Sequence, residues 1–298
     1  MFVPVLTVTQ PASSYDLVSL ATVKSELSIQ TIDTSNDVWL SGSITQSSKA
    51  IAKYCGRVFV CEGVSEKFDV RRDYFGTPIR TFSPSLRLSR RPLISVTSVV
   101  QYPVGNPSVS LVQDTDFRVD SDGGSLNRLN SDTGLLKGWE EQPLLVNYVA
   151  GFGALLTEEL AVAGTPAQVT VSQAAAYSFT QSVSYTGGAT LSAVASNPAA
   201  GQYAVSNGVY TFNSADVGKS VTISYAYNQI PDDLVDVCLR LITARFRSKG
   251  RDPALVQSDM PGSGSMRYWV GGAPHQNGPF PPEISSMLDS SYRVPVVG

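Results

Sequence analysis

Two successive helical patterns fill residues 16–61, with a polar break between them. Ser19 is suited to cap the first helix, because its hydroxyl can accept a hydrogen bond from a first-turn amide that has no partner within the helix. Leu20, Val23 and Leu27 follow at helical spacing. The pattern therefore predicts a short helix with one apolar face, which another element has to cover.

A longer helix is predicted after the break. Asp33 and Thr34 are the expected caps at its start, and Gly56 is expected to end it in the left-handed conformation. A plain helical hairpin within a core would show the same pattern, so these residues alone indicate no function. The apolar and small residues that recur at steps of three and four are Leu40, Ile44, Ser47 or Ser48, Ile51, and Tyr54 or Cys55.

The composition is that of a globular protein. The chain has 298 residues, of which 42% are apolar and 16% charged, enough for one large core or two smaller ones. It contains no run of about 18 apolar residues, and residues 1–10 lack the basic start and apolar centre of a signal peptide. We therefore expect a soluble protein that is neither secreted nor inserted in a membrane.

Three cysteines, Cys55, Cys61 and Cys238, show no spacing typical of metal ligands. An odd number without a disulfide framework favours buried free thiols in a reducing cytoplasm. A bridge between Cys55 and Cys61 is the alternative that the sequence leaves open.

The formal net charge of −3 hides an uneven distribution along the chain. Basic residues outnumber acidic ones between residues 66 and 91, and acidic residues dominate the stretch that follows. Such asymmetry suits a protein that stacks between charged partners or surrounds DNA without reading its sequence. The alternative is a solvated strand face with local ion pairs. The candidate charges toward DNA or a partner are Arg71, Arg72, Arg87, Arg90 and Arg91.

Alternating apolar residues predict a small antiparallel sheet after the helices. Residues 86–100 and 116–120 are rich in β-forming side chains, the Gly123-Gly124 pair is a turn, and residues 144–151 supply a further strand.

The segment 154–228 is nearly free of charge and rich in Ser, Thr, Val, Ala, Tyr and Gly. Asn207-Gly208 lies between two alternating runs and is a strong signal for a two-residue hairpin. Residues 221–227 alternate as a closing strand. The segment is therefore predicted to be an extra β domain.

Pro231 suits the first position of a third helix. Asp232 and Asp233 lie at the positive end of its dipole, and Arg245 and Arg247 at its negative end. Its apolar residues cover more of the helix than one intramolecular face requires. The helix is therefore either central in the core or shared with a neighbouring subunit. The candidate interface residues are Val235, Leu239, Ile242 and Phe246.

From Gly250 onward Pro, Gly and Ser dominate, and little regular structure is predicted. Large apolar and aromatic side chains nevertheless lie in this tail, and a mobile arm that carries such anchors usually docks on another surface. The anchors are Tyr268, Trp269, Phe280, Ile284, Met287, Leu288 and Tyr292.

The sequence offers little support for catalysis. His275 is the single histidine, and Gly151-Phe152-Gly153 lacks the third glycine of a dinucleotide fingerprint. Asp120-Ser121-Asp122-Gly123 is similar to part of a calcium loop, but Arg118 stands where the first carboxylate belongs, so a hairpin turn is predicted. Glu140-Glu141 would support acid–base chemistry only in a shared pocket. We expect no enzyme, no cofactor and no metal site.

The order of these elements resembles the head-to-tail connector (adaptor) family of tailed double-stranded DNA phages. The resemblance lies in the opening helices that close with Tyr54-Cys55-Gly56-Arg57, the strand after Arg90-Arg91-Pro92, the turn near Asp122-Gly123, the strand Val146–Gly151, and the tail from Phe280-Pro281-Pro282-Glu283-Ile284 to Tyr292-Arg293-Val294. The family passes soon from that last strand to a helix that begins with proline and acidic residues. Here Pro231-Asp232-Asp233 arrives about 75 residues later, so 154–228 is interpreted as an insertion similar to small β modules of other phage virion proteins.

The resemblance implies an α+β fold, with a helical bundle, a small antiparallel sheet, an inserted β domain and an extended C-terminal arm. The expected domains are a connector core of residues 1–153, the insertion 154–228, and a core helix with the arm in residues 229–298. Members of the family form a ring under the portal, commonly of twelve copies, and extend the DNA channel.

The implied partners are the portal protein, a head-closure or tail-terminator protein, identical subunits, and double-stranded DNA that passes without specific contacts. The arm is expected to pack against the portal or an adjacent connector, with Arg293 as a candidate ion-pair donor. The implied location is the neck of the virion at the portal vertex, after assembly in the host cytoplasm and without a membrane partner. The alternative is a virion attachment or decoration protein that binds a glycan or receptor through 154–228.

Overall fold

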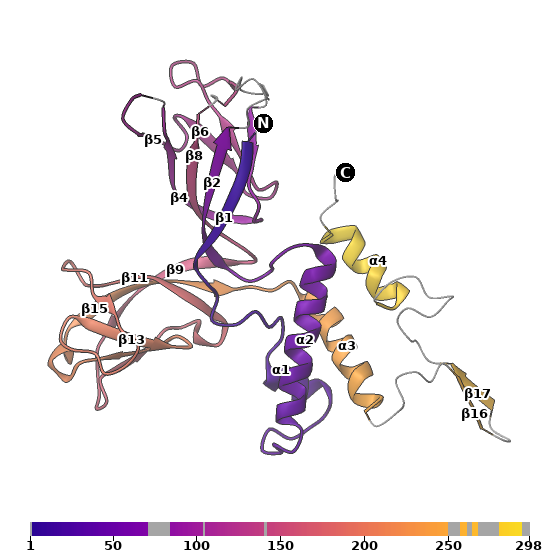
Figure 1. Cartoon of the computed structure of the whole chain (residues 1–298). Coiled ribbons are helices and arrows are strands. Elements are labelled where there is room, and N and C mark those ends of the chain that lie inside the picture. The colour runs from indigo at the N-terminus through magenta and orange to yellow at the C-terminus, as the bar shows by residue number, and fades with distance from the viewer. Residues whose placement is uncertain are drawn as a thin grey trace. The chain divides into compact units, whose positions relative to one another are not determined.

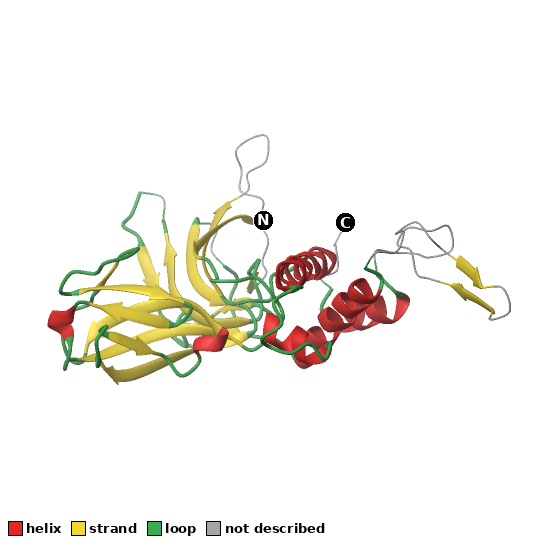
Figure 2. Cartoon of the chain, turned by 90° about the horizontal axis from the view of Figure 1, so that it is seen from below, coloured by secondary structure: helices red, strands yellow, loops and turns green. Residues whose placement is uncertain are grey.

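The computed structural model describes residues 2–70, 84–103, 105–139, 142–249, 257–260, 264–267 and 280–293. The chain divides into two compact units, one of residues 1–14 and 60–229 and the other of residues 15–59 and 230–298. Strands build the first unit, and the four α-helices among the described residues belong to the second (Figures 1 and 2). Helices combined with mostly antiparallel sheets confirm the broad α+β class. The domain boundaries after residues 153 and 228 stay a prediction.

The first unit contains a five-stranded antiparallel sheet in the order β1-β2-β8-β4-β5. Its strands are β1 (Phe2–Gln10), β2 (Glu62–Val70), β8 (Leu144–Ala150), β4 (Leu93–Gln101) and β5 (Val109–Leu111). A smaller sheet of β3 (Ser85–Arg87), β7 (Ser125–Arg128) and β6 (Phe117–Asp120) shares its core. The predicted small sheet is confirmed, whereas β1, β2 and β5 have no counterpart among the predicted strands. Pro4 of β1 is tolerated because an edge strand can lack one backbone N–H.

The turn between β6 and β7 is the predicted hairpin turn. The Asp120 carboxylate accepts hydrogen bonds from the Gly123 amide at 3.1 Å and the Ser125 hydroxyl at 3.4 Å, so its oxygens hold the turn. Gly124 has a φ of 65°, in the left-handed region that glycine favours. Within the described part of the chain, no group of three or more His, Cys, Asp or Glu side chains is placed to hold a metal ion.

A second β body, the β module, lies within the first unit. One of its sheets has the order β11-β15-β9, from β11 (Tyr177–Tyr185), β15 (Ser220–Asn228) and β9 (Gly153–Ala161). The other has the order β10-β14-β13-β12, from β10 (Gln168–Thr170), β14 (Val209–Phe212), β13 (Gln202–Ser206) and β12 (Ser192–Ala193). Two 3₁₀ turns, η1 (Ala174–Ala176) and η2 (Ser214–Asp216), complete it. Both sheets contribute to one core around Tyr210, Ile223 and Tyr225.

The predicted Asn207-Gly208 hairpin is confirmed between β13 and β14. Both residues have a positive φ, 47° for Asn207 and 75° for Gly208, and Ser206 pairs with Val209 across the turn. This is the conformation that an Asn-Gly pair favours at the tip of a two-residue hairpin.

The β module is joined to the five-stranded sheet by a buried junction. Cys61, Val149, Phe179 and Ala226 form one apolar cluster, in which the first two come from the five-stranded sheet or its margin and the last two from the β module. The Cys61 amide donates to Asn228 Oδ1 at 2.8 Å, and the Ser178 hydroxyl donates to the Cys61 carbonyl at 2.7 Å. The module is therefore held by packing and by buried hydrogen bonds rather than by its two connecting segments alone.

The second unit contains α1 (Leu20–Glu26), α2 (Asp37–Cys55), α3 (Asp232–Arg247) and α4 (Pro282–Ser291). It also contains a two-stranded hairpin of β16 (Gln257–Met260) and β17 (Gly264–Arg267). Ser19 caps α1 as predicted, with its hydroxyl accepting from the Thr22 amide at 3.1 Å. Gly56 ends α2 with a φ of 65°, also as predicted. No described helix is both long and apolar enough to span a membrane.

The predicted caps of α2 are wrong. Asn36 is its N-cap, and no side chain caps the helix there. The Asp33 carboxylate instead accepts from the Ser35 amide at 3.0 Å, so it organises the loop one turn before the helix. Similarly, Pro231 is the N-cap of α3 rather than its first helical residue, although Asp232 and Asp233 occupy the first turn as expected.

All three cysteines are buried free thiols, as predicted. Burial raises the pKa of Cys55 to about 11, of Cys61 to about 12 and of Cys238 to about 11. The thiols therefore stay protonated and unreactive at neutral pH.

A substitution at Gly151 tests how closely the backbone segments approach one another at the junction. Gly151 has a φ of 131°, and a β-carbon there would collide with the Val60 carbonyl. We expect Gly151→Ala to lower the free energy of unfolding by about 2–4 kcal/mol, from backbone strain and overpacking together. Chemical denaturation of the full chain measures it. Gly187→Ala is the control, because Gly187 also has a positive φ but open space around it. Equal effects of the two substitutions would contradict the close approach.

Asp216 gives the β module a pH dependence. Its carboxyl is fully buried and accepts hydrogen bonds from the Tyr185 hydroxyl at 2.7 Å and Lys219 Nζ at 2.8 Å. Burial by itself raises the pKa of Asp216, but these hydrogen bonds outweigh it and lower the pKa below its usual value. The carboxylate therefore stabilises the fold above the unfolded pKa of about 3.9 and loses this contribution as pH falls through the folded pKa.

We accordingly expect Asp216→Asn to lower the free energy of unfolding by about 2–3 kcal/mol at pH 7, because a charged acceptor is lost. The difference from the wild type should shrink below pH about 4. Denaturation at a series of pH values measures it, with the exposed Asp122→Asn as control. A difference that does not change with pH would contradict the assignment.

Candidate assembly surfaces

The surface of α3 divides into a buried side and a half-buried side. Leu234, Val237, Cys238, Leu241 and Ile242 are buried against the rest of the unit. Ile242, a predicted interface residue, is fully buried, so it supports the helix from within. The other predicted interface residues, Val235, Leu239 and Phe246, remain half-buried at the surface. The helix thus keeps an apolar row that its own unit covers only in part.

Polar contacts run along the rest of α3. The Arg240 guanidinium pairs with Asp236 at 2.7 Å one turn away, where the Arg240 side chain is exposed and the Asp236 side chain about half exposed. Ser48 of α2 lies inside the bundle, where its hydroxyl accepts from the Leu17 amide at 3.0 Å and is 3.9 Å from the Cys238 sulfur. These contacts explain how Ser48 in the α2 stripe is buried without losing its hydrogen bonds.

The end of α3 adjoins a hollow at the start of α2. The Phe246 ring meets the Trp39 ring edge-on at 5.8 Å, and Lys249 Nζ lies 5.4 Å from the Trp39 ring centre. A cavity of about 380 Å³ opens there, lined by Gly42, Arg245 and other residues of the two helices. Val38 at its rim is 90% exposed, which is unusual for an aliphatic side chain.

The arm residues of α4 are covered by their own chain. Phe280, Ile284 and Leu288 are buried, and the Phe280 ring meets the Tyr54 ring edge-on at 5.2 Å. Tyr292 meets Phe59 in the same way at 5.7 Å. Their predicted contact with a portal or an adjacent subunit stays a prediction, because the described residues satisfy them within the unit.

Polar groups fasten the end of α4 to α2 and α3. The Tyr292 hydroxyl donates to the two Asp233 oxygens at 2.6 and 2.8 Å, and the Tyr54 hydroxyl donates to Asp289 at 3.0 Å. Burial and the bond to Asp233 raise the pKa of Tyr292. Arg293 pairs with Asp289 at 3.1 Å and lies over the Tyr54 ring, so its ion pair in this structure is intramolecular.

The arginine cluster, which consists of Arg71, Arg72, Arg87, Arg90 and Arg91, is only partly available to a partner. Arg87 is exposed and Arg91 half-buried, and burial together with the charge of Arg87 lowers the pKa of Arg91. Arg90 is 3.2 Å from the buried carboxylate of Glu62, so its charge serves the fold. Arg71 and Arg72 lie outside the described residues, as do the predicted anchors Tyr268 and Trp269 and the Glu140-Glu141 pair.

A buried carboxylate on β2 was not anticipated from the sequence. Glu66 is fully buried and accepts hydrogen bonds from the Tyr148 hydroxyl at 2.7 Å and the Ser89 amide at 3.0 Å. Burial and this hydrogen bond raise the pKa of Tyr148. The available signal was the spacing of Glu62 and Glu66, which places both carboxylates on one face of a strand. Together they hold residues 89–90, the segment that carries the arginine cluster into β4.

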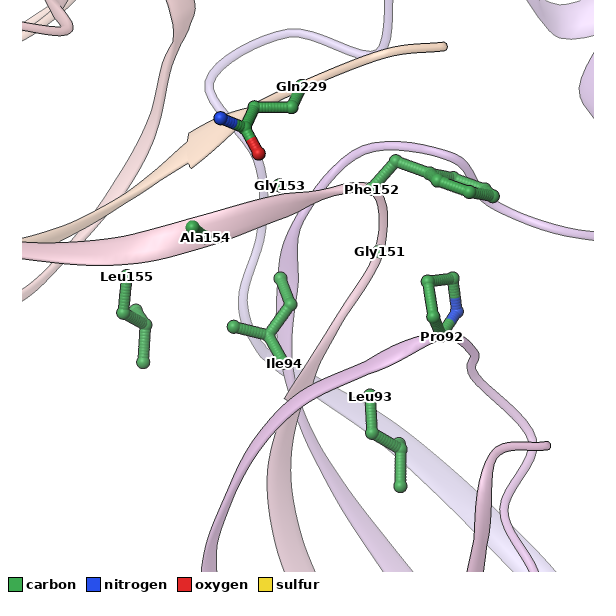
Figure 3. Close-up of a pocket in the computed structure, with 9 residues that line it drawn as sticks. All are labelled: Pro92, Leu93, Ile94, Gly151, Phe152, Gly153, Ala154, Leu155 and Gln229. Carbon is green, nitrogen blue, oxygen red and sulfur yellow. The ribbon is translucent and has the colours of Figure 1, made fainter. Parts of the chain in front are cut away.

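A cavity of about 570 Å³ opens beside the junction in the first unit. Leu155 of β9 and Ile94 of β4 lie on opposite sides of the space between these strands, and Phe152 lies where β8 passes into β9 (Figure 3). The lining is mostly apolar and backbone, with the exposed Gln229 as the polar side chain. It holds no pair of titratable groups, so it offers a docking hollow rather than a reaction centre.

The tyrosines of the β module serve its core. Tyr177, Tyr203, Tyr210 and Tyr225 are buried, and their rings contact one another. The Tyr225 hydroxyl is also close to Glu158 and the Gln173 amide. These rings present no open platform on which a sugar could stack.

Structures of gene transfer agent particles are similar to this chain in outline. A chain from the virion of a native gene transfer agent particle has 10% sequence identity and a TM-score of 0.44, with 98% of this chain and 97% of that chain covered. A chain from the neck of an empty gene transfer agent particle, computed with C6 symmetry, has 12% identity and a TM-score of 0.33, with 50% and 71% covered. Both scores are below 0.5, so neither likeness carries an argument about function. No protein-family model matches the sequence, and no curated protein matches it.

Tyr292 tests how α4 is fastened. We expect Tyr292→Phe to speed hydrogen exchange of the α4 amides by about tenfold, because the hydrogen bond to a charged carboxylate is lost while the ring is kept. Mass spectrometry of peptides that cover 282–291 measures it at neutral pH. The exposed Tyr102→Phe is the control. Exchange that stays at the wild-type rate would show that the hydroxyl does not hold the helix.

Proposed function

We propose that this protein is a head-to-tail connector of a tailed double-stranded DNA phage. In this role it forms a homo-oligomeric ring under the portal, extends the DNA channel, and receives a head-closure or tail-terminator protein. Its place is the neck of the virion at the portal vertex. The role is mechanical, because the work lies in packing between subunits rather than in reactive side chains.

The observation that carries the proposal is the half-buried row of Val235, Leu239 and Phe246 on a helix whose other side is fully buried. A ring of identical subunits supplies a neighbour for such a row, and burial of apolar area then stabilises the assembly. The arrangement also follows the order of elements in the connector resemblance. The opening helices and the helix after Pro231 belong to one unit, although most of the chain lies between them.

The exposed part of the arginine cluster supports a loose contact with DNA. Arg87 is exposed beside Arg91; Arg87 ends β3, which pairs with β7, and neither arginine lies on a helix. Such charges attract phosphates without reading bases. This is the contact that a channel needs, because DNA of any sequence has to pass through it.

The attachment or decoration role remains the second candidate for the β module. The buried tyrosines remove the sugar-stacking platform that would have favoured it. A connector uses the module as a surface contact instead.

Leu239→Glu tests the proposal without removing any element of the fold. We expect it to reduce the yield of tailed particles by at least about tenfold in a complementation assay, because a carboxylate would be buried in each subunit contact. Arg240→Ala is the matched control on the exposed side of the same helix, and it should assemble normally. Point variants are preferable to truncation after Gly250, because α4 also packs on its own chain.

Normal tailed particles with Leu239→Glu, from protein that is folded by circular dichroism, would contradict the connector role. Deletion of 154–228 separates the two candidates. An attachment protein should then give filled, tailed particles that no longer adsorb to cells, whereas a connector whose subunit contacts are disturbed should give filled heads without tails.

A further inference from the structure

The free edge of β9 differs from every other described sheet edge in length and regularity. Its nine residues pair with β15 without a register shift, and it contains no proline. β1 is as long but contains Pro4 and a register shift near Val8, and β11 has two register shifts. The remaining described edges, β3, β5, β6, β10, β12, β16 and β17, have four residues or fewer. Proline, bulges and shortness are three of the usual means of blocking strand addition, and β9 has none of these three; its only charged residues are Glu158 and Glu159.

The hydrogen bonds at the two ends of β9 show which amides face outward. The Gln229 amide donates to the Phe152 carbonyl at 2.8 Å, and the Val162 amide donates to the Lys219 carbonyl at 2.9 Å. Both fit the register in which β9 and β15 pair, so the even-numbered residues of β9 point their backbone groups toward β15. The odd-numbered residues therefore direct their N–H and C=O groups to the free edge. They are Gly153, Leu155, Thr157, Glu159 and Ala161.

The hairpin of β16 and β17 is a sheet of only two strands in the described part of the chain. Its two strands pair over four residues each, from Gln257 with Arg267 to Met260 with Gly264, and no third strand joins them in the described part of the chain. A two-stranded hairpin alone is only marginally stable in water, and a third strand is the usual remedy. Among the described residues, the β16–β17 hairpin thus has no third strand, and the outer edge of β9 has no neighbouring strand.

We propose that the β16–β17 hairpin of a second copy of this chain adds to the free edge of β9. The main-chain ladder supplies the attraction, and the hollow between Leu155 and Ile94 receives a side chain from the incoming strand. The contact joins two different surfaces, so repetition generates a ring or a helical array rather than a closed pair. It rests on the proposed function only in requiring a neighbouring copy.

Disulfide trapping between two populations tests the contact. One full-length population carries Glu159→Cys, and a second of different mass carries Ser258→Cys on β16 or Ser265→Cys on β17. The native cysteines are buried and do not interfere. Mixtures are oxidised both as concentrated protein and after addition to isolated portal. We expect a mixed dimer with at least one hairpin variant, and far less product from either population alone.

Thr157→Pro in the first population is the decisive variant. It removes one outward N–H and leaves the ladder with β15 intact, so we expect the mixed dimer to fall by about tenfold. Thr157→Val is the matched control, because both variants lose the 2.7 Å contact of the Thr157 hydroxyl with Ser224 but valine keeps the N–H.

Three outcomes would overturn the proposal. They are no mixed dimer with either hairpin position, a mixed dimer that Thr157→Pro leaves unchanged, and a link between β9 and the hairpin of the same chain when both cysteines are present. None of these outcomes tests the α3 row, the half-buried residues Val235, Leu239 and Phe246. If a ring forms on the portal but the disulfide does not form, the connector role stands and the strand-addition proposal fails. If the mixed dimer is trapped but no ring forms on the portal, the strand-addition proposal stands and the connector role fails.

Discussion

The buried junction around Cys61 is the constraint on which the first unit depends. The backbone amide of Cys61 donates to Asn228, and its carbonyl accepts from Ser178. Its side chain lies in the cluster with Val149 and Phe179. Gly151 and Gly153 are required beside it, because a β-carbon at either position would collide with neighbouring backbone. The β module therefore packs directly against the five-stranded sheet at this junction. The cavity and the start of the β9 edge both follow from it, since β9 begins at Gly153.

Local signals in the sequence predicted local structure well. Ser19, Gly56 and Asn207-Gly208 act through their own backbone conformation or a neighbouring amide, so the surrounding fold does not decide their role. The α2 stripe was correct for a related reason, because helical spacing alone sets which residues share a face. Within the tail, the buried positions of α4 were anticipated as anchors, although their partner in the structure is the unit's own α2.

Features that depend on residues far apart in the chain could not be predicted from the sequence. The cap of α2 was wrong because Asp33 found a nearer amide at Ser35. β1 was missed because an edge strand needs only one neighbour, and the partner β2 lies more than fifty residues away in the chain. Arg90 was placed among the available charges because nothing local reveals that Glu62 is buried beside it. Ile242 was assigned to an interface because periodicity cannot tell an inner apolar face from a shared one.

The two proposed contacts use different surfaces of the chain. The α3 row would bury apolar area between helical units, and strand addition at β9 would tie the second unit of one copy to the β module of its neighbour. Electron microscopy of the purified protein mixed with isolated portal particles tests the central claim most directly. The connector account predicts an added ring of density at the narrow end of the portal. Folded, monodisperse protein that adds no density there at saturating concentration would contradict it.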